Sequence, residues 1–161
     1  MIIDIVIARV DERLIHGQIV NEWIQKLRPT HLLIVDYELL HDPFMSNIYK
    51  AMAPFWVEVH ILSPKDAYQF FCKGGNLDAK VFLLARKPDM YEELIDHGAD
   101  ISEIVLAEKK YMPNKRKAAI ESKIAINHLL DKGVRIVIQE FPNEESFVVK
   151  KYKIENTEER E

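Results

Sequence analysis

Cysteine is nearly absent from this chain, because Cys72 is the only one among 161 residues. A single cysteine cannot close an internal disulfide, which excludes a small disulfide-stapled fold, and it cannot supply a multi-cysteine zinc or iron–sulfur site. The chain also has no run of the ~18 apolar residues that a membrane helix needs. Its apolar start is interrupted by Asp4 and follows no basic region, so it is not typical of a signal peptide. These absences favour a cytoplasmic protein.

Excess positive charge and clustered glycine are lacking too. The 22 Lys and Arg residues against 26 Asp and Glu give a net charge of −4, which disfavours a nucleic-acid-binding role. None of the five glycines forms a Gly-rich turn after the first apolar run, as a dinucleotide-binding fold requires. The third apolar run ends in Leu62 and Ser63 without the acceptor aspartate of a receiver domain. The composition, 48% hydrophobic and 30% charged, is that of an ordinary globular domain.

Short apolar runs alternate with helix-like segments along the whole chain. The runs predict strands at 2–8, 31–36, 57–62, 80–85, 101–107 and 134–139, and a short last strand at 146–150. Apolar spacing and Pro or Gly boundaries predict helices at 17–27, 39–52, 64–73, 88–98 and 118–132. The alternation predicts an α/β fold: an open, mainly parallel twisted sheet with helices on both faces. We expect a single domain over 1–161, with a charged C-terminal tail from about 150.

Ligands of open α/β sheets bind beyond the carboxyl ends of the strands, so the residues at these positions are candidates. The segment after the first strand is the richest and holds Arg9, Asp11, Glu12, Arg13 and His16, directly before Gly17. Later strand ends supply Asp36, Glu38, Arg86, Glu108, Lys109 and Lys110. A helix N-terminus and arginines favour an anion, and a neutral histidine is a nucleophile. The pattern indicates a site where a phosphoryl group is held on His16; the alternative is a solvated surface loop.

Residues 8–20, ARVDERLIHGQIV, carry a resemblance to a known family. They resemble the signature A-R-[IV]-D-D-R-L-[IL]-H-G-Q-V of the mannose/fructose/sorbose-type IIB components of the bacterial sugar phosphotransferase system. Residues 34–38, IVDYE, are similar to the family's V-V-D-D-E, and residues 41–43, HDP, to its N-D-P. The similarity extends to about Phe141 and is strongest up to Ser63.

The resemblance implies a transferase. The family histidine that matches His16 accepts a phosphoryl group from a IIA partner and donates it to a sugar held by membrane IIC and IID subunits. The family arginines that match Arg9 and Arg13 face the phosphate, with Gly17 opening the helix beside them. The expected chain is a cytoplasmic phosphocarrier, peripherally associated with the membrane permease. It needs neither metal nor cofactor and binds no nucleic acid.

Further residues are expected to support this site. Asp11 or Asp36 is expected to orient the ring of His16. Residues 106–112, LAEKKYM, lack the glycines that the family usually carries after the fifth strand, and Lys109 or Lys110 is expected to add positive charge there. The same departure supports an alternative: a regulatory or binding module of this fold that has lost phosphotransfer.

The remaining histidines show no pattern of a metal site. His60 lies within the third predicted strand and is expected to be structural. The others lie at element ends or on helix faces without the spacing of metal ligands: His31, His41, His97 and His128.

Overall fold

The computed structural model describes residues 3–73, 78–113, 115 and 117–154. It contains a seven-stranded sheet in the order β3-β2-β4-β1-β5-β6-β7. The strands are β1 Ile3–Val10, β2 His31–Val35, β3 Glu58–Leu62, β4 Ala79–Ala85, β5 Glu103–Leu106, β6 Arg135–Ile138 and β7 Phe147–Val148. The first six are parallel, and only β7 runs antiparallel to its neighbour β6. This confirms the predicted α/β class.

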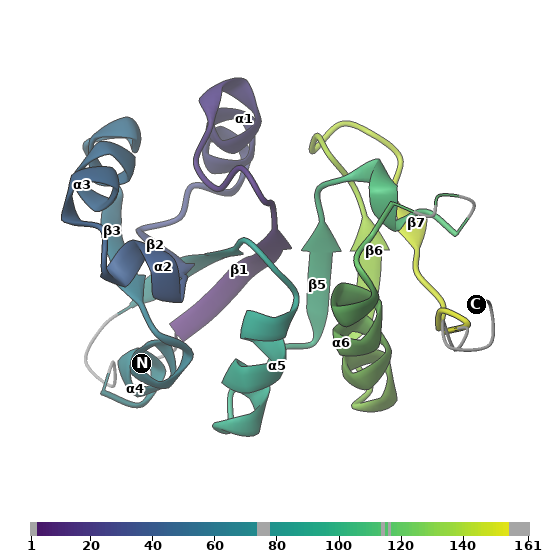
Figure 1. Ribbon diagram of the computed structural model, residues 1–161. Coiled ribbons are helices and arrows are strands. Elements are labelled where there is room, and N and C mark those ends of the chain that lie inside the picture. The colour runs from purple at the N-terminus through teal and green to yellow at the C-terminus, as the bar shows by residue number, and fades with distance from the viewer. Residues whose placement is uncertain (1–2, 74–77, 114, 116, 155–161) are drawn as a thin grey trace.

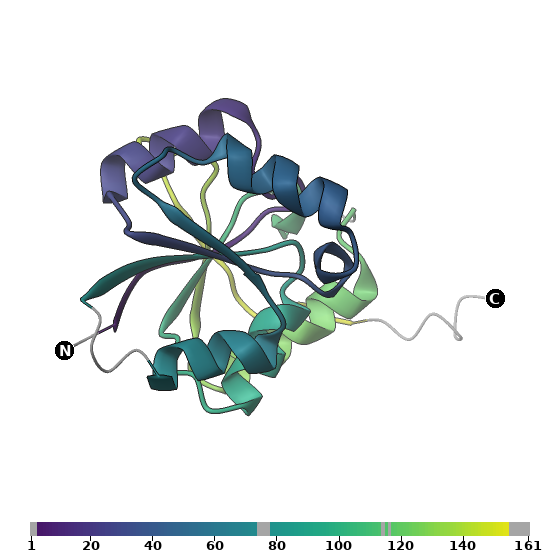
Figure 2. The ribbon, with the colours of Figure 1, turned by 90° about the vertical axis from the view of Figure 1, so that its left-hand side faces the viewer.

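Helices cover both faces of the sheet (Figures 1 and 2). They are α1 Gly17–Leu27, α2 Tyr37–Leu40, α3 Pro43–Met52, α4 Pro64–Lys73, α5 Asp89–Asp96 and α6 Ile120–Asp131, with a short 3₁₀ helix, η1, at Lys109–Tyr111. One apolar core packs α1 and α3 against the sheet, with Trp23 and Ile24 among its buried residues. The other packs α4, α5 and α6 against the opposite face. Within the described residues, no helix is long and apolar enough to cross a membrane.

The parallel strands end in one row. The register aligns the last residues of neighbouring strands, in the order Leu62, Val35, Ala85, Val10, Leu106 and Ile138. The loops that follow therefore meet at one edge of the sheet. β1 lies in the middle of this row, between β4 and β5. The chain leaves β1 toward α1 on one face, whereas β4 and β5 lead to α5 and α6 on the other (Figure 1). Such a divergence of loops is where α/β proteins bind their ligands.

Several predicted boundaries are wrong, and two of them concern the candidate site residues. The helix expected over 39–52 is two helices, because Asp36 caps α2 and Asp42 caps α3: each carboxylate accepts the backbone N–H three residues later, at Leu39 and Met45. The first strand continues past the expected end at Ala8 to Val10, so Arg9 lies in the sheet and not in the loop. The charged tail expected from about 150 lies partly outside the described residues.

Candidate functional site

The candidate site lies at the edge where the strands end, on the loop between β1 and α1. The loop begins at the fully buried Asp11, whose backbone N–H donates to the carbonyl of Ala85 at the end of β4. Leu14 has a left-handed backbone, φ 53°, and its side chain is completely buried, which anchors the middle of the loop in the core. His16 is the extended N-cap residue, and Gly17 begins α1 with φ 34°, a conformation that glycine adopts at little cost. The loop therefore presents His16 at a helix N-terminus, as predicted.

Asp11 connects two of the predicted site residues. Its Oδ1 accepts both the backbone N–H of Arg13, at 3.0 Å, and the side-chain Nε–H of Arg13, at 3.1 Å. Its Oδ2 lies 3.9 Å from Nδ1 of His16. Arg13 is nearly half exposed, while Asp11 is buried. The buried carboxylate thus holds an exposed guanidinium close to the histidine.

The two ring nitrogens of His16 have different surroundings. Nδ1 lies 3.2 Å from the carbonyl oxygen of Leu14, so an N–H at this position can donate to it. Nε2 is buried and has no hydrogen-bond partner among the described residues. About a quarter of the side chain is nevertheless exposed, 27%. Nε2 can reach a group on another molecule only if the ring turns, whereas Nδ1 has to give up its contact with Leu14.

Arg9 is fully buried and lies within β1. Its guanidinium donates to the carbonyl oxygens of Gln139, at 2.8 Å, and Glu140, at 2.7 Å, in the segment after β6. Burial lowers the pKa of Arg9 to about 10, and the nearby Asp11 carboxylate opposes this shift. These contacts tie the end of β1 to the end of β6. A contact of Arg9 with a phosphate stays a prediction.

Glu108 and Lys110 form the side of the site that follows β5. Oε1 of Glu108 accepts the backbone N–H of Glu12 at 2.8 Å, and Nζ of Lys110 pairs with the carboxylates of Glu12 and Glu108. Burial raises the pKa of Glu108 above its ordinary value, while the Glu12 N–H and the Lys110 ammonium oppose the rise. Lys110 thus reaches the β1–α1 loop, although two carboxylates balance its charge. The sequence had suggested no role for Glu108 beyond its place at a strand end.

Asp36 and Arg86 form a separate pair at the ends of β2 and β4. Oδ2 of Asp36 caps α2 and lies 3.7 Å from a guanidinium nitrogen of Arg86, which also faces Glu38 at 3.7 Å. The described side-chain contacts of Asp36 go to α2 and Arg86, so a role in orienting His16 stays a prediction.

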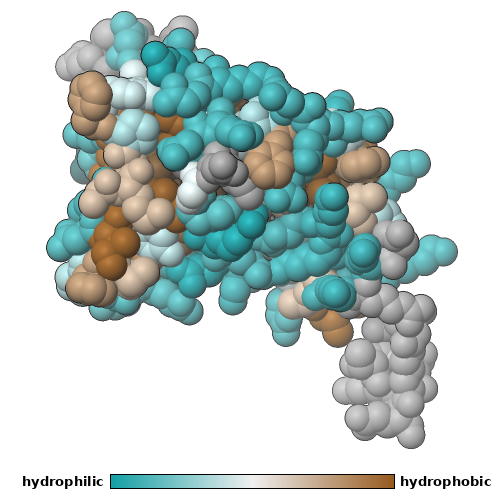
Figure 3. Space-filling model, turned by 90° about the horizontal axis from the view of Figure 1, so that it is seen from above, coloured by the Kyte–Doolittle hydropathy of each residue, from teal (hydrophilic) through white to brown (hydrophobic). Residues whose placement is uncertain are grey.

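Figure 3 looks onto this edge of the sheet: the surface is mostly hydrophilic, and apolar side chains gather on the side of α3. The exposed apolar residues of that side are Tyr37, Leu40, Phe44, Ile48 and Met52.

Sequence comparison finds relatives of this chain among known proteins. The chain is 26% identical over 149 residues to the fructose-specific EIIB component of the PTS system of Bacillus subtilis (strain 168), covering 89% of this chain and 91% of that protein. It is 27% identical over 111 residues to the sorbose-specific EIIB component of Lacticaseibacillus casei, covering 69% of this chain and 68% of that protein.

Solved structures show the same fold. The crystal structure of manxB from Thermoanaerobacter tengcongensis matches with a TM-score of 0.78 and 28% identity, over 90% of this chain and 92% of that one. The IIBSor domain of the sorbose permease from Klebsiella pneumoniae matches with a TM-score of 0.81 over 90% of this chain and 93% of that one; at 22% identity it supports the fold alone. The family model described as PTS system sorbose subfamily IIB component matches residues 5–160. The chain therefore belongs to the sorbose subfamily of IIB components of the sugar phosphotransferase system, and its role lies in sugar phosphotransfer.

Proposed function

We propose that this chain is a phosphohistidine carrier: His16 accepts a phosphoryl group from a IIA partner and passes it to a sugar during uptake. One observation carries the proposal. His16 stands at the N-terminus of α1, at the carboxyl end of β1, with the Asp11–Arg13 pair beside it. A partial positive charge at the helix N-terminus and a guanidinium both favour a phosphoryl group at this position.

Each transfer exchanges one bond for another. An unprotonated ring nitrogen of His16 attacks the phosphorus on the donor, so the new N–P bond forms as the donor's bond to phosphorus breaks. In the second transfer, a sugar hydroxyl oxygen attacks the phosphorus, the N–P bond of His16 breaks, and the hydroxyl proton is released. Before the attack, either Nδ1 gives up its contact with the Leu14 carbonyl or the ring turns to uncover Nε2. The exposed Arg13 then stabilises the negative charge on the transferring oxygens.

The other predicted residues have supporting roles in this proposal. Gly17 supplies the first backbone N–H of α1, and its positive φ allows the turn from His16 into the helix. Asp11 positions Arg13 and His16. Asp36 supports the site indirectly, because it holds Arg86 and the start of α2 in place. Lys110 offsets the carboxylates of Glu12 and Glu108, which would otherwise repel an incoming phosphoryl group. Arg9 adds a buried positive charge in the same neighbourhood, since Asp11 and Arg13 both influence its pKa.

The partners follow from the same proposal. A IIA domain supplies the phosphoryl group, and a membrane IIC/IID permease presents the sugar, so the chain works at the cytoplasmic surface of that permease. The alternative is a regulatory or binding module that has lost phosphotransfer. Its support is the segment after β5, where Glu108 and Lys110 occupy the rim of the β1–α1 loop in place of the glycines typical of the family.

The test is phosphorylation in a reconstituted relay. The chain is incubated with phosphoenolpyruvate, the general phosphotransferase enzymes and a competent IIA partner, and acid-labile phosphate is measured on the wild type, on His16→Ala and on His97→Ala. His97 is an exposed histidine at the end of α5 and serves as the matched control. We expect phosphate on the wild type and on His97→Ala, and none on His16→Ala. Undiminished phosphate on His16→Ala would place the acceptor elsewhere, and an unphosphorylated wild type would favour the regulatory alternative.

A further inference from the structure

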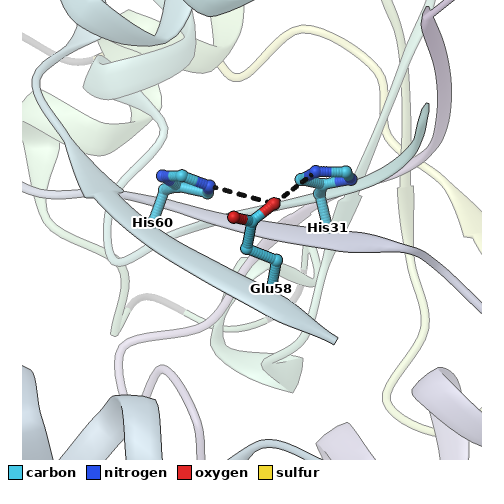
Figure 4. A group of neighbouring side chains, drawn as sticks. All are labelled: His31, Glu58 and His60. Atoms are coloured by element: carbon cyan, nitrogen blue, oxygen red, sulfur yellow. Dashed lines mark ion pairs between the residues drawn. The ribbon is translucent and has the colours of Figure 1, made fainter. Parts of the chain in front are cut away.

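Three side chains with metal-binding groups converge at the opposite end of the sheet from His16 (Figure 4). His31 begins β2, and Glu58 begins β3 directly across from it in the parallel register. His60 follows Glu58 by two residues, so its side chain leaves the same face of β3. Glu58 is 27 residues from His31 in the sequence, which is why spacing along the chain gave no sign of a metal site. The strand pairing brings them together.

The distances between these side chains suit ligands of one ion. Oε2 of Glu58 lies 2.7 Å from Nε2 of His31 and 3.6 Å from Nε2 of His60. One ligand atom from each residue lies within 4.8 Å of the other two. Ligand atoms about 2.0–2.2 Å from a tetrahedral zinc ion lie ~3.4 Å from one another, so small movements would complete the site. Glu58 can make such a movement, because 63% of its side chain is exposed.

Two features of the histidine rings favour the binding of an ion between them and Glu58. Nε2 of His60 is buried without a hydrogen-bond partner among the described residues, although the ring faces Glu58. The ring of Phe70, from α4, lies 5.5 Å from the rings of both histidines, and these stack on each other at 6.1 Å. The two rings are therefore held in place with their Nε2 atoms directed at the carboxylate.

Thr30 provides the outer contact that metal-bound histidines usually have. Its Oγ1 lies 2.7 Å from Nδ1 of His31 and can also donate to the carbonyl of Lys80 at 3.2 Å. When Nε2 binds a metal, the single proton of a neutral imidazole resides on Nδ1, where it needs an acceptor. Thr30 supplies this acceptor while its own hydrogen turns to Lys80. The proton arrangement required by a metal ligand is thus available without any change of backbone.

We propose that His31, Glu58 and His60 bind a divalent transition-metal ion of the zinc class. Two imidazoles and one carboxylate are a donor set typical of zinc, and they leave a fourth position for water or for a group from another molecule. The ion ties the edge strand β3 to β2 and thereby stabilises the edge of the sheet. His31 lies four residues before Val35, the last residue of β2, so the ion lies ~13 Å along the strand from the edge that carries His16. The site is therefore separate from phosphotransfer.

Titration calorimetry with zinc chloride tests this on the tag-free full chain. We expect saturable 1:1 binding to the wild type, with a higher melting temperature in the presence of zinc. Binding should weaken at least tenfold in Glu58→Gln and in His60→Gln, both of which change partly exposed residues and should fold. Thr30→Val should weaken binding about tenfold through the lost contact to His31, and Thr30→Ser should retain it.

His128→Gln is the matched control. His128 pairs with Glu92 at 2.6 Å, the same kind of contact as that of His31 with Glu58. Among the described residues, however, no third metal-binding side chain joins this pair. This variant should bind zinc like the wild type. Absence of saturable binding to the wild type would overturn the proposal, as would binding unchanged in both Glu58→Gln and His60→Gln. Neither result bears on the proposed role of His16, because the two sites lie at opposite ends of the sheet and are tested by different assays.

Discussion

Arg9 and Trp23 donate to the same carbonyl oxygen. Nη2 of Arg9 lies 2.7 Å and Nε1 of Trp23 lies 2.8 Å from the oxygen of Glu140, and the guanidinium carbon lies 4.9 Å from the centre of the indole ring. β1, α1 and the segment after β6 therefore meet at one acceptor. The planar guanidinium is suited to this position, since it can stack on the ring and still direct two donors at two carbonyls.

From this arrangement we expect Arg9→Lys to destabilise the fold. A lysine cannot stack in the same way or reach both carbonyls, so one buried acceptor loses its charged donor, at a cost of about 2 kcal/mol in the free energy of unfolding. Chemical denaturation measures the loss. Arg135→Lys is the control, because Arg135 also lies on a strand but is exposed, and its change should stay within about 0.5 kcal/mol. A stable Arg9→Lys variant with defective phosphorylation would instead assign Arg9 to phosphate binding.

Glu108 should make stability depend on pH. Its pKa is raised in the folded state because of burial, so between the ordinary carboxyl pKa and this raised value the folded chain binds more protons than the unfolded chain. The contribution of Glu108 to stability consequently improves as the pH falls through this window and worsens as the pH rises. Glu108→Gln removes the titration while an amide oxygen can still accept the Glu12 N–H. The free energy of unfolding of the wild type, relative to this variant, should increase as the pH falls toward the ordinary carboxyl pKa. A pH-independent difference would contradict the assignment.

The local parts of the fold could be predicted from the sequence. α1 begins and ends at the residues expected, because Gly17, the apolar spacing and Pro29 act within one segment. The end of β1 was misplaced because a charged residue in a strand is normally exposed. Nothing near Arg9 in the sequence indicates that carbonyls 130 and 131 residues away satisfy its guanidinium.

In the candidate site, too, contacts within one segment could be predicted from the sequence, and contacts between distant segments could not. Asp11, Arg13 and His16 lie within six residues, so their proximity followed from the motif itself. The pairing of Lys110 with Glu12 joins positions 98 residues apart and depends on the register of β1 with β5, which the sequence pattern does not contain. For the same reason, the contact of Glu108 with the loop was not foreseen.

Lys110→Ala should slow phosphorylation by the IIA partner. The substitution leaves the carboxylates of Glu12 and Glu108 without their shared cation, beside the path of an anionic group. A partly exposed ion pair is worth up to about 1 kcal/mol, which corresponds to about a fivefold lower rate. Lys109→Ala is the control, since Lys109 is the exposed neighbour in η1. Equal rates for the wild type and both variants would show that Lys110 is a surface lysine without influence on transfer.

Asp11 and Arg13 should act on phosphotransfer as one unit. Asp11→Asn retains an oxygen that can accept the Arg13 backbone N–H, so the turn of the loop survives, but it removes the charge that holds the Arg13 guanidinium. We expect Asp11→Asn and Arg13→Gln each to lower the rate of His16 phosphorylation about tenfold, and the double variant to lower it little further. Such non-additivity is expected because a freed Arg13 and an absent Arg13 stabilise the transferring phosphoryl group equally poorly. The measurement is a double-mutant cycle of single-turnover rates, with circular dichroism to verify the fold of each variant. Fully multiplicative effects would mean that Asp11 acts on His16 independently of Arg13, through the contact between its Oδ2 and Nδ1 of the ring.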